Sequence, residues 1–466
     1  MMRSRLYSFV VSFFVLGACS VNTQTFHPPT PLPEKFSPSG QQPLLDKWWL
    51  NFNDNKLNTL IDLALEQNPD LLASYDRLAQ AKAIAKKAGA ELVPSVNLES
   101  GSSRSFENAS NQTTRTFDDW SLGLAAAYEL DLWGRIRANT AAAELDVQAS
   151  EQDIQSAAIS LSAEIASAWY FLTEQRKQLE LLSQQIKVNE QYADLVYVRF
   201  KGGQATAADV FQQRQLLEGV IGDRFTVRAN ITVLENQLSI LTGQPPGSLK
   251  LQPDADFPRL LELPDTGLPS ELILRRPDLR KAYYRIQAAD LRVAAAIADR
   301  FPKISLSAGI GTSAPDLQSF FNNWMATLAG NLLLPVIDGN RRLAEVERNQ
   351  ALTAEALNLY GQRILQALKE VENALAQEKQ QALRLESLKK QLQYLNAANE
   401  NIGIRSAYGA FDFLRMLSTL NSLQTSQRTR IRAERELIEF RINLYRSLAG
   451  GWLSINNDPE RQTAHD

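Results

Sequence analysis

The sequence is 466 residues long, 44% hydrophobic and 22% charged, with a formal net charge of −3. That charge excludes a basic nucleic-acid-binding protein, and the length allows two or three domains of ordinary size. The two histidines, His27 and His465, lie in polar end segments and cannot anchor a metal cluster in a folded core. Because Cys19 is the single cysteine, a framework of disulfides within the chain is excluded as well.

The first 18 residues have the pattern of a signal peptide. Two arginines precede an apolar run at 6–16, and the small residues Gly17 and Ala18 then lead to Cys19. The run is too short to span a membrane, and a short buried helix with an incidental cysteine is the alternative. Residues 19–47 are rich in Pro, Thr, Ser and Gln, so we expect an extended linker before the folded part.

The folded part contains an internal repeat. A shift of 208 residues pairs Pro69-Asp70-Leu71 with Pro277-Asp278-Leu279, and a shift of 204 to 206 pairs later segments, including Gly203 with Gly409. We therefore divide the chain into repeats and connections. They are a first repeat at 48–242, a crossover at 243–275, a second repeat at 276–449 and a tail at 450–466.

Each repeat carries two segments with the period-two alternation of β-strands. The clearest is Trp120 to Trp133, in which every even position is apolar or aromatic. An apolar stripe of this length that ends in aromatics is typical of a transmembrane barrel strand, and an ordinary antiparallel sheet packed on helices is the alternative. The predicted strands are 93–101, 119–133, 301–311 and 323–338, with a polar turn at 102–118.

Each repeat also carries a long helix and a return helix. Stepping alternately four and three residues from Ile154 to Phe200 gives fourteen positions, of which twelve are apolar, as in a coiled-coil seam. The first long helix, 134–200, would be about 100 Å long at 1.5 Å per residue. Glycines at the turns Gly202-Gly203 and Gly409 reverse the chain into hairpins. The predicted helices are 134–200 and 206–242 in the first repeat, and 339–406 and 411–449 in the second.

Four strands cannot close a barrel, and an open sheet edge in lipid leaves backbone groups unpaired at several kcal/mol each. If the strands lie in a membrane, several copies must therefore assemble. Two copies give eight strands, whose interior is filled by side chains, whereas three copies give twelve strands with room for water. A trimer is the smallest assembly of this chain that encloses a channel.

With these features, the chain resembles the outer-membrane efflux proteins, the TolC-type channels, over nearly all of 48–452. Cys19 at the end of the signal peptide resembles the lipidated cysteine of the OprM-like and NodT-like lipoprotein branch. The resemblance rests on the duplication and on several motifs. They are Trp48-Trp49, Arg275 to Gly309, Leu132-Trp-Gly-Arg135, Pro335-Val-Ile-Asp-Gly339 and Leu448-Ala-Gly-Gly-Trp452.

The resemblance implies an α+β membrane protein, a TolC-like trimer. Its 12-stranded β-barrel, with four strands per protomer, is continuous with a long 12-helix α-barrel in the periplasm. It implies the exit duct of a tripartite efflux pump for small molecules, working with a periplasmic adaptor and an inner-membrane transporter. The duct would be anchored in the bacterial outer membrane by a lipid on Cys19, with no cofactor, metal or catalytic activity. A protein-secretion duct and a structural coiled-coil lipoprotein are the alternatives.

The family closes its periplasmic end with side chains just after the second helical turn, commonly acidic ones six and nine residues beyond the glycine. Here those positions are Arg415 and Ser418, with Leu414 as a further residue expected to point inward. The repeat-equivalent position to Arg415 is Asp209. We hypothesise that Asp209 and Arg415 pair between neighbouring hairpins and hold the aperture closed. Solvated helix-end charges, worth under about 1 kcal/mol, are the alternative.

Overall fold

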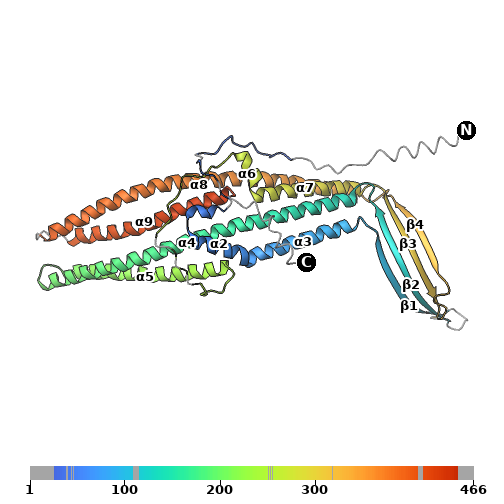
Figure 1. The fold of residues 1–466 in the computed structure, drawn as a ribbon, viewed down its shortest axis with the longest axis horizontal. Helices are drawn as coiled ribbons and strands as arrows, with labels where there is room; N and C mark the ends of the chain where they lie inside the picture. Colours follow the sequence, from blue (N-terminus) through green and yellow to red (C-terminus); the bar gives the residue numbers. More distant parts are fainter. Residues whose placement is uncertain are drawn as a thin grey trace. The chain divides into compact units, whose positions relative to one another are not determined.

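The structure is a computed structural model that describes residues 26–449, with gaps at 38–39, 44, 46, 109–114, 250, 252, 254–255, 317 and 408–412. In this part, groups of helices alternate along the chain with pairs of strands, and the four strands form one sheet (Figure 1). The elements are η1 (Trp48–Phe52), α2 (Asn55–Gln67), α3 (Pro69–Ala90), β1 (Ser95–Glu107), β2 (Arg115–Leu130), α4 (Arg135–Lys201), α5 (Ala207–Leu241), α6 (Pro269–Arg275), α7 (Pro277–Ala298), β3 (Lys303–Ala314), β4 (Met325–Leu333), α8 (Arg341–Ala407) and α9 (Phe413–Ser447).

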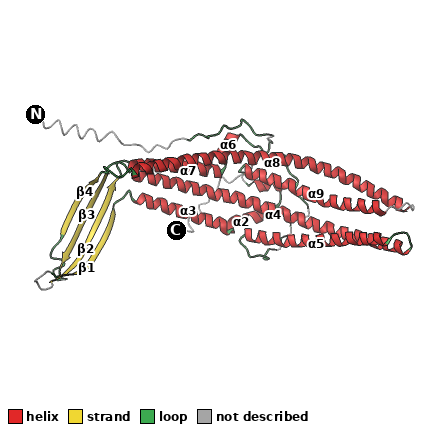
Figure 2. Cartoon of the chain, turned by 180° about the vertical axis from the view of Figure 1, so that it is seen from behind, coloured by secondary structure: helices red, strands yellow, loops and turns green. Residues whose placement is uncertain are grey.

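The chain forms two compact units. Within the described residues, the first unit contains the sheet and the helical segments next to it in sequence, from residues 26–30, 76–152 and 278–362. The second contains the two hairpin ends and the crossover, from residues 31–75, 153–277 and 363–449. Figure 2 shows the four strands side by side in the first unit. Each unit contains segments of both repeats, so the two repeats do not correspond to the two units.

The duplication is visible in the lengths of the helices. α4 and α8 have 67 residues each, and α5 and α9 have 35 each. α3 and α7 have 22 residues each, and both begin with Pro-Asp-Leu. The long and return helices begin and end within about two residues of the predicted bounds, because coiled-coil periodicity and glycine turns define helix ends well.

The strand ends differ from the prediction. β1 continues to Glu107 and β2 begins at Arg115, so most of the predicted turn at 102–118 is strand. The ladder continues through this part although most of its residues are polar and Phe106 and Phe117 lie on opposite faces. β4 ends at Leu333 rather than at 338. Pro335 follows and has no N–H to donate to a ladder, which explains the early end of the strand.

The core of the second unit follows the predicted seam of α4. Buried seam residues include Ile165, Leu172 and Val196, whereas Phe200 at the end of the seam is 42% exposed. The two polar seam positions are buried as well, and both form hydrogen bonds: Gln175 accepts one from the side chain of Asn230 at 3.2 Å, and Asn189 belongs to a network described below. Polar groups at seam positions fix the register of packed helices.

Aromatic residues from distant parts of the chain form a second core in this unit. Trp48 stacks on Tyr445 with ring centroids 5.4 Å apart, and Phe52 lies against Tyr170 at 5.3 Å. The indole N–H of Trp169 donates a hydrogen bond of 2.7 Å to the Asp54 carboxylate, whose other oxygen caps α2. The start of the folded chain is therefore fixed to α4 and α9.

Candidate functional site: the strand sheet and the hairpin ends

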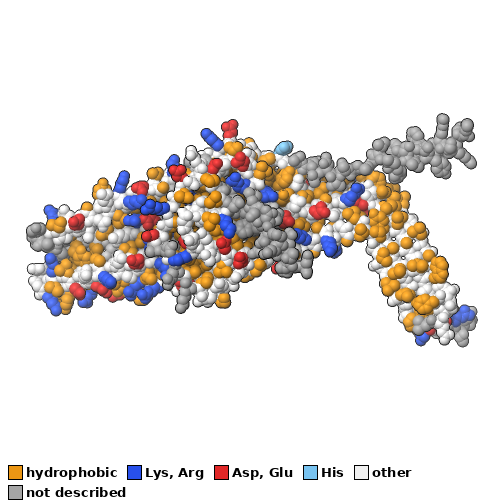
Figure 3. Space-filling view, in the orientation of Figure 1, with side chains coloured by type: hydrophobic (Ala, Val, Ile, Leu, Met, Phe, Trp, Pro, Cys, Tyr) orange, Lys and Arg blue, Asp and Glu red, His pale blue; other side chains and the backbone are white. Residues whose placement is uncertain are grey.

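The sheet has one apolar and one polar face. Its order is β1-β2-β3-β4, all antiparallel, and the register pairs even residues with even residues throughout. Leu98, Leu124 and Ile310 share a row on the even face, and Figure 3 shows apolar side chains along these strands. The neighbouring rows of the odd face carry mostly Gly, Ala, Thr and Asn, together with Glu99 and Met325. This is the pattern of a barrel wall with lipid on one side and water on the other.

The sheet is open at both edges. In the described part of the chain, β1 and β4 each pair with one neighbour only. Apolar side chains of β4 are largely exposed, with Leu328 at 84% and Leu332 at 69%. Unpaired backbone groups cannot remain so in lipid. The edges therefore require strands from other chains.

A contact between the two repeats fixes the helix-proximal end of the sheet. The Trp133 ring, just after β2, stacks on Phe301 with centroids 4.9 Å apart. Its indole N–H donates a hydrogen bond of 2.7 Å to the Pro302 carbonyl, just before β3. Asp131 then caps α4 by accepting hydrogen bonds from the backbone N–H groups of Ile136 and Arg137. The Leu-Trp-Gly-Arg motif thus joins a strand to a long helix.

The first hairpin turn follows the prediction. Gly203 has φ +71°, a left-handed conformation that favours glycine, and the neighbouring Gly202 N–H donates to the Val198 carbonyl at 3.2 Å. Thr206 and Asp209 then form a capping box at the start of α5. The two other predicted site residues, Cys19 and Gly409, lie outside the described residues.

The structure brings the starts of α5 and α9 together. Val196, Val210, Phe413 and Met416 form one buried apolar cluster that joins α4 and α5 to α9. Asp209 and Arg415 are the sequence neighbours of Val210 and Met416, so they flank the same cluster. The Asp209 carboxylate accepts hydrogen bonds from the Thr206 backbone N–H and hydroxyl at 2.7 and 2.9 Å. A pair between Asp209 and Arg415 stays a prediction.

The remaining predicted aperture residues lie on the first turns of α9. Leu414, Arg415 and Ser418 are exposed, with Leu414 at 64%. An exposed leucine at this end is available to face a channel or another chain. The inward direction of Leu414 in an assembled channel likewise stays a prediction.

A network of buried amides lies on the same helices as the apolar cluster, and it was not predicted from the sequence. The Asn189 amide donates to Gln424 at 3.1 Å, and the Gln213 amide donates to the Asn189 side-chain oxygen at 3.2 Å. Gln185 donates to the Gln424 carbonyl at 3.2 Å. The network joins α4, α5 and α9 through side chains that do not titrate. The interruption of the seam at Asn189 was the one signal of it in the sequence.

Two ion pairs with buried carboxylates were likewise not predicted from the sequence. Arg441 on α9 donates to both oxygens of Glu378 on α8, with Nε at 3.1 and 3.0 Å. Glu174 on α4 accepts from Arg435 at 3.0 Å. Burial raises the pKa of Glu174, and the nearby Arg435 offsets this only in part. Each pair joins two helices of the second unit.

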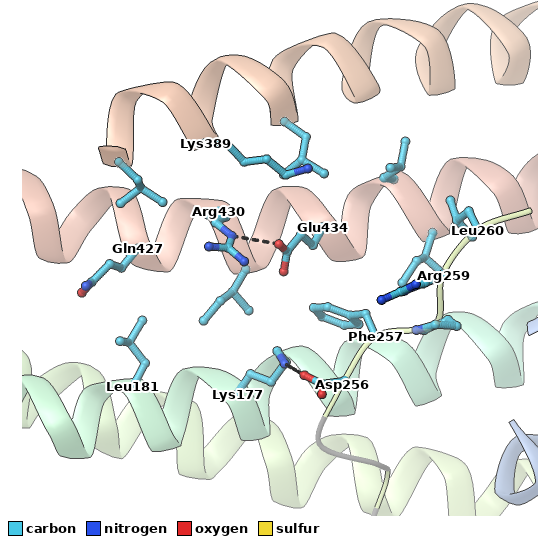
Figure 4. Close-up of a pocket in the computed structure, with 16 residues that line it drawn as sticks. Lys177, Leu181, Asp256, Phe257, Arg259, Leu260, Lys389, Gln427, Arg430 and Glu434 are labelled. Atoms are coloured by element: carbon cyan, nitrogen blue, oxygen red, sulfur yellow. Dashed lines mark hydrogen bonds and ion pairs between the residues drawn. The ribbon is translucent and has the colours of Figure 1, made fainter. Parts of the chain in front are cut away.

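The crossover lines an open groove of about 1070 Å³ between α4, α8 and α9. Figure 4 shows Phe257 in this groove, beside an ion pair between Lys177 and Asp256 of 3.0 Å. Arg430 pairs with Glu434 at 2.9 Å on its other side. The pair between Lys177 and Asp256 attaches the crossover to α4, whereas the pair between Arg430 and Glu434 lies within α9.

The described residues contain no group of three or more His, Cys, Asp or Glu side chains suited to holding a metal ion. None of the described helices is both long and apolar enough to cross a bilayer.

An open sheet with an apolar and a polar face, linked to long helical hairpins, defines a class of protein. The chain is a channel-forming membrane protein whose wall is assembled from several chains. A family model described as "Outer membrane efflux protein" matches residues 60–244 and 268–450. The chain belongs to this family, as the sequence motifs predicted.

Curated relatives match the chain over nearly its whole length. The pyoverdine export outer membrane protein OpmQ of Pseudomonas aeruginosa is 30% identical and covers 97% of this chain and 98% of its own. The cation efflux system protein CusC of Escherichia coli O6:H1 is 28% identical and covers 96% of this chain and 99% of its own.

Solved structures agree. The outer-membrane channel OprN has a TM-score of 0.84 at 27% identity and covers 93% of this chain and 100% of its own. A CusC structure has a TM-score of 0.84 at 26% identity with the same coverage. The predicted TolC-like fold, the outer-membrane location and the function as an efflux channel are confirmed.

Proposed function

We propose that three copies of this chain assemble into an exit duct in which β4 of each copy pairs with β1 of the next. The open four-stranded sheet carries the proposal, because each copy presents one free edge of each kind. Three copies give twelve strands with an apolar outer face and a water-filled interior. The odd face, with its small polar residues, lines the channel.

The helical hairpins form the periplasmic part of the duct. Their ends carry exposed apolar side chains on both hairpins, including Val198 and Phe211 on the first and Ile404 and Leu414 on the second. Exposed apolar residues grouped at one end mark an interaction surface. We assign this surface to a periplasmic adaptor, through which the duct works with an inner-membrane transporter.

The proposal includes a lipid on Cys19 that anchors the mature chain, and neither a cofactor nor catalytic activity. The cargo is small molecules, in line with the relatives. Proteins of similar identity are named for pyoverdine export, cation efflux and toluene efflux. Because relatives in the same family are named for such different cargoes, we expect the inner-membrane pump to select among drug-like molecules.

The mass of the detergent-solubilised protein tests the assembly. Light scattering should give three chains per particle, and the particles should conduct in planar bilayers. A Cys19→Ala variant should lose labelling by radioactive fatty acid but keep the trimer. A monomer would contradict the duct. A trimer of the Cys19→Ala variant that stays in solution without detergent would favour the structural coiled-coil lipoprotein.

The Asp209 and Arg415 pair has its own test in the same bilayers. If it holds the aperture closed, Arg415→Ala and Asp209→Ala trimers should show a higher conductance in the closed level than the unchanged protein. Thr206→Ala is the matched control, because it breaks the capping box and leaves both charges in place. An unchanged closed level in Arg415→Ala removes the hypothesis.

A further inference from the structure

The polar face of the sheet carries a single charged residue in its central rows, Glu99. The neighbouring row on one side is Asn97, Ala125, Gly309 and Thr327. The row on the other side contains Gly101, Ser121 and Ser313. Asp119 lies in the row beyond and accepts a hydrogen bond from the Ser313 hydroxyl. The three central rows of this face therefore carry one carboxylate per chain, Glu99, which has small or uncharged neighbours.

The row of Glu99 leaves its side chain uncovered. Its partners across the sheet are Gly123, Gly311 and Met325. A Cβ at Gly311 would lie 2.9 Å from the Leu122 carbonyl oxygen, and one at Gly123 would lie 3.2 Å from a backbone oxygen. The close approach of β2 and β3 thus leaves no room for a Cβ at Gly311 without a shift, and little room at Gly123. Glu99 is exposed beside two residues without side chains.

The basic residues of this face are matched by acids close to them. Arg115 lies opposite Glu107 in the register. Lys303, at the start of β3, pairs with Asp299 at 2.7 Å. The acid nearest the helices, Glu129, likewise pairs with Arg135 at 3.0 Å. Glu99 has Gly123 opposite and Ser121 and Ala125 on the diagonals, so β2 brings no basic residue to it.

The other neighbour of β1 brings none either. In the proposed trimer, on which this inference rests, β1 lies beside β4 of the next copy. β4 reads Met-Ala-Thr-Leu-Ala-Gly-Asn-Leu-Leu and contains no charged residue. Whatever the register between the copies, no strand residue of β4 can neutralise Glu99.

We propose that Glu99 gives the barrel part of the duct its preference for cations. Threefold assembly places three Glu99 carboxylates at one height around the channel. Fixed charges of one sign in a narrow aqueous passage raise the local concentration of counterions. The effect should fall with salt, because the Debye length shortens from about 10 Å at 0.1 M to about 3 Å at 1 M.

Reversal potentials of single trimers in a KCl gradient test this proposal. Glu99→Gln should lower the ratio of K⁺ to Cl⁻ permeability by about two- to fivefold near 0.1 M salt, and by much less near 1 M. Glu99→Gln combined with Thr327→Glu returns a carboxylate to the next row of the same face. It should restore most of the ratio, which a merely structural role of Glu99 would not allow.

An unchanged permeability ratio in Glu99→Gln would overturn the proposal, and so would a loss that Thr327→Glu does not restore. Failure of the duct itself is distinguishable, because the unchanged protein would then form no trimers and no conductance steps.

Discussion

The ion pair between Arg441 and Glu378 offers a quantitative test of what holds the second hairpin together. The two side chains are 3% and 7% exposed. Arg441 also donates to the backbone carbonyls of Leu261 and Glu262 in the crossover at 2.9 and 3.1 Å. One guanidinium therefore joins α8, α9 and the crossover.

Replacing one residue of the pair should lower the free energy of unfolding much more than replacing both. Arg441→Met leaves a buried carboxylate unpaired, which costs about 3–5 kcal/mol. Leu261 and Glu262 are exposed residues, so we expect water to replace Arg441 at the two carbonyls and this loss to add little. Glu378→Leu should cost about 3 kcal/mol, since Arg441 keeps the two carbonyl acceptors. Arg441→Met with Glu378→Leu removes both charges and should return to within about 2 kcal/mol of the unchanged protein.

The midpoint of the loss of helical circular dichroism on heating measures this, with all four proteins in one detergent at one heating rate. The single variants should lose on the order of 5–15 °C and the double variant only a few degrees. A double variant that is as unstable as the two single losses added together would refute the reasoning. Packing rather than charge would then account for the stability.

Three further predictions concern pH, backbone and the repeat junction. Burial raises the pKa of Glu174 above the ordinary carboxyl value of 4.5. Binding of a proton to Glu174 therefore stabilises the folded protein, and this contribution is lost as the pH rises through the pKa of the folded state. As the pH is lowered from 7 to 4.5, the thermal midpoint of the unchanged protein should therefore rise relative to that of Glu174→Gln. Parallel curves of midpoint against pH would contradict this. Gly243→Ala should cost more than about 2 kcal/mol, since its Cβ would lie 2.4 Å from the Gln67 carbonyl oxygen. Gly203→Ala, also at positive φ but with open space around it, should cost about 1 kcal/mol, and equal losses of thermal midpoint would contradict the steric argument. Trp133→Phe keeps the aromatic stack at the junction but loses one hydrogen bond, so it should cost about 1 kcal/mol, with a larger loss in Trp133→Ala; equal losses would mean that the stack contributes nothing.

The faces of the sheet and the lengths of the helices could be predicted from the sequence because both follow from simple periodicities. Leu98, Leu124 and Ile310 alternate with small or polar residues, and the observed register keeps them on one face. The outer ends of the strands were harder to predict from the sequence. In β1, Ser103 and Ser105 are polar like the residues of a turn, and only the ladder shows that the strand continues.

The interactions that join the hairpins could not be predicted, because charged residues on a coiled coil ordinarily face solvent. Arg441 and Glu378 are 63 residues apart and give no pattern that pairs them. Asn189 did interrupt the apolar seam, but its partner Gln424 lies 235 residues away. Local periodicity predicts which face of a helix is buried, whereas the choice of polar partner depends on how the helices cross.

The open sheet has a consequence for how the protein is made. A newly exported copy has two strand edges ready to pair and an uncharged β4 with exposed leucines, which is a surface prone to aggregation. Assembly into a closed trimer therefore competes with aggregation before the chain reaches the membrane. Escort proteins that shield nascent strands, and a slow supply of new chains, would favour the productive branch.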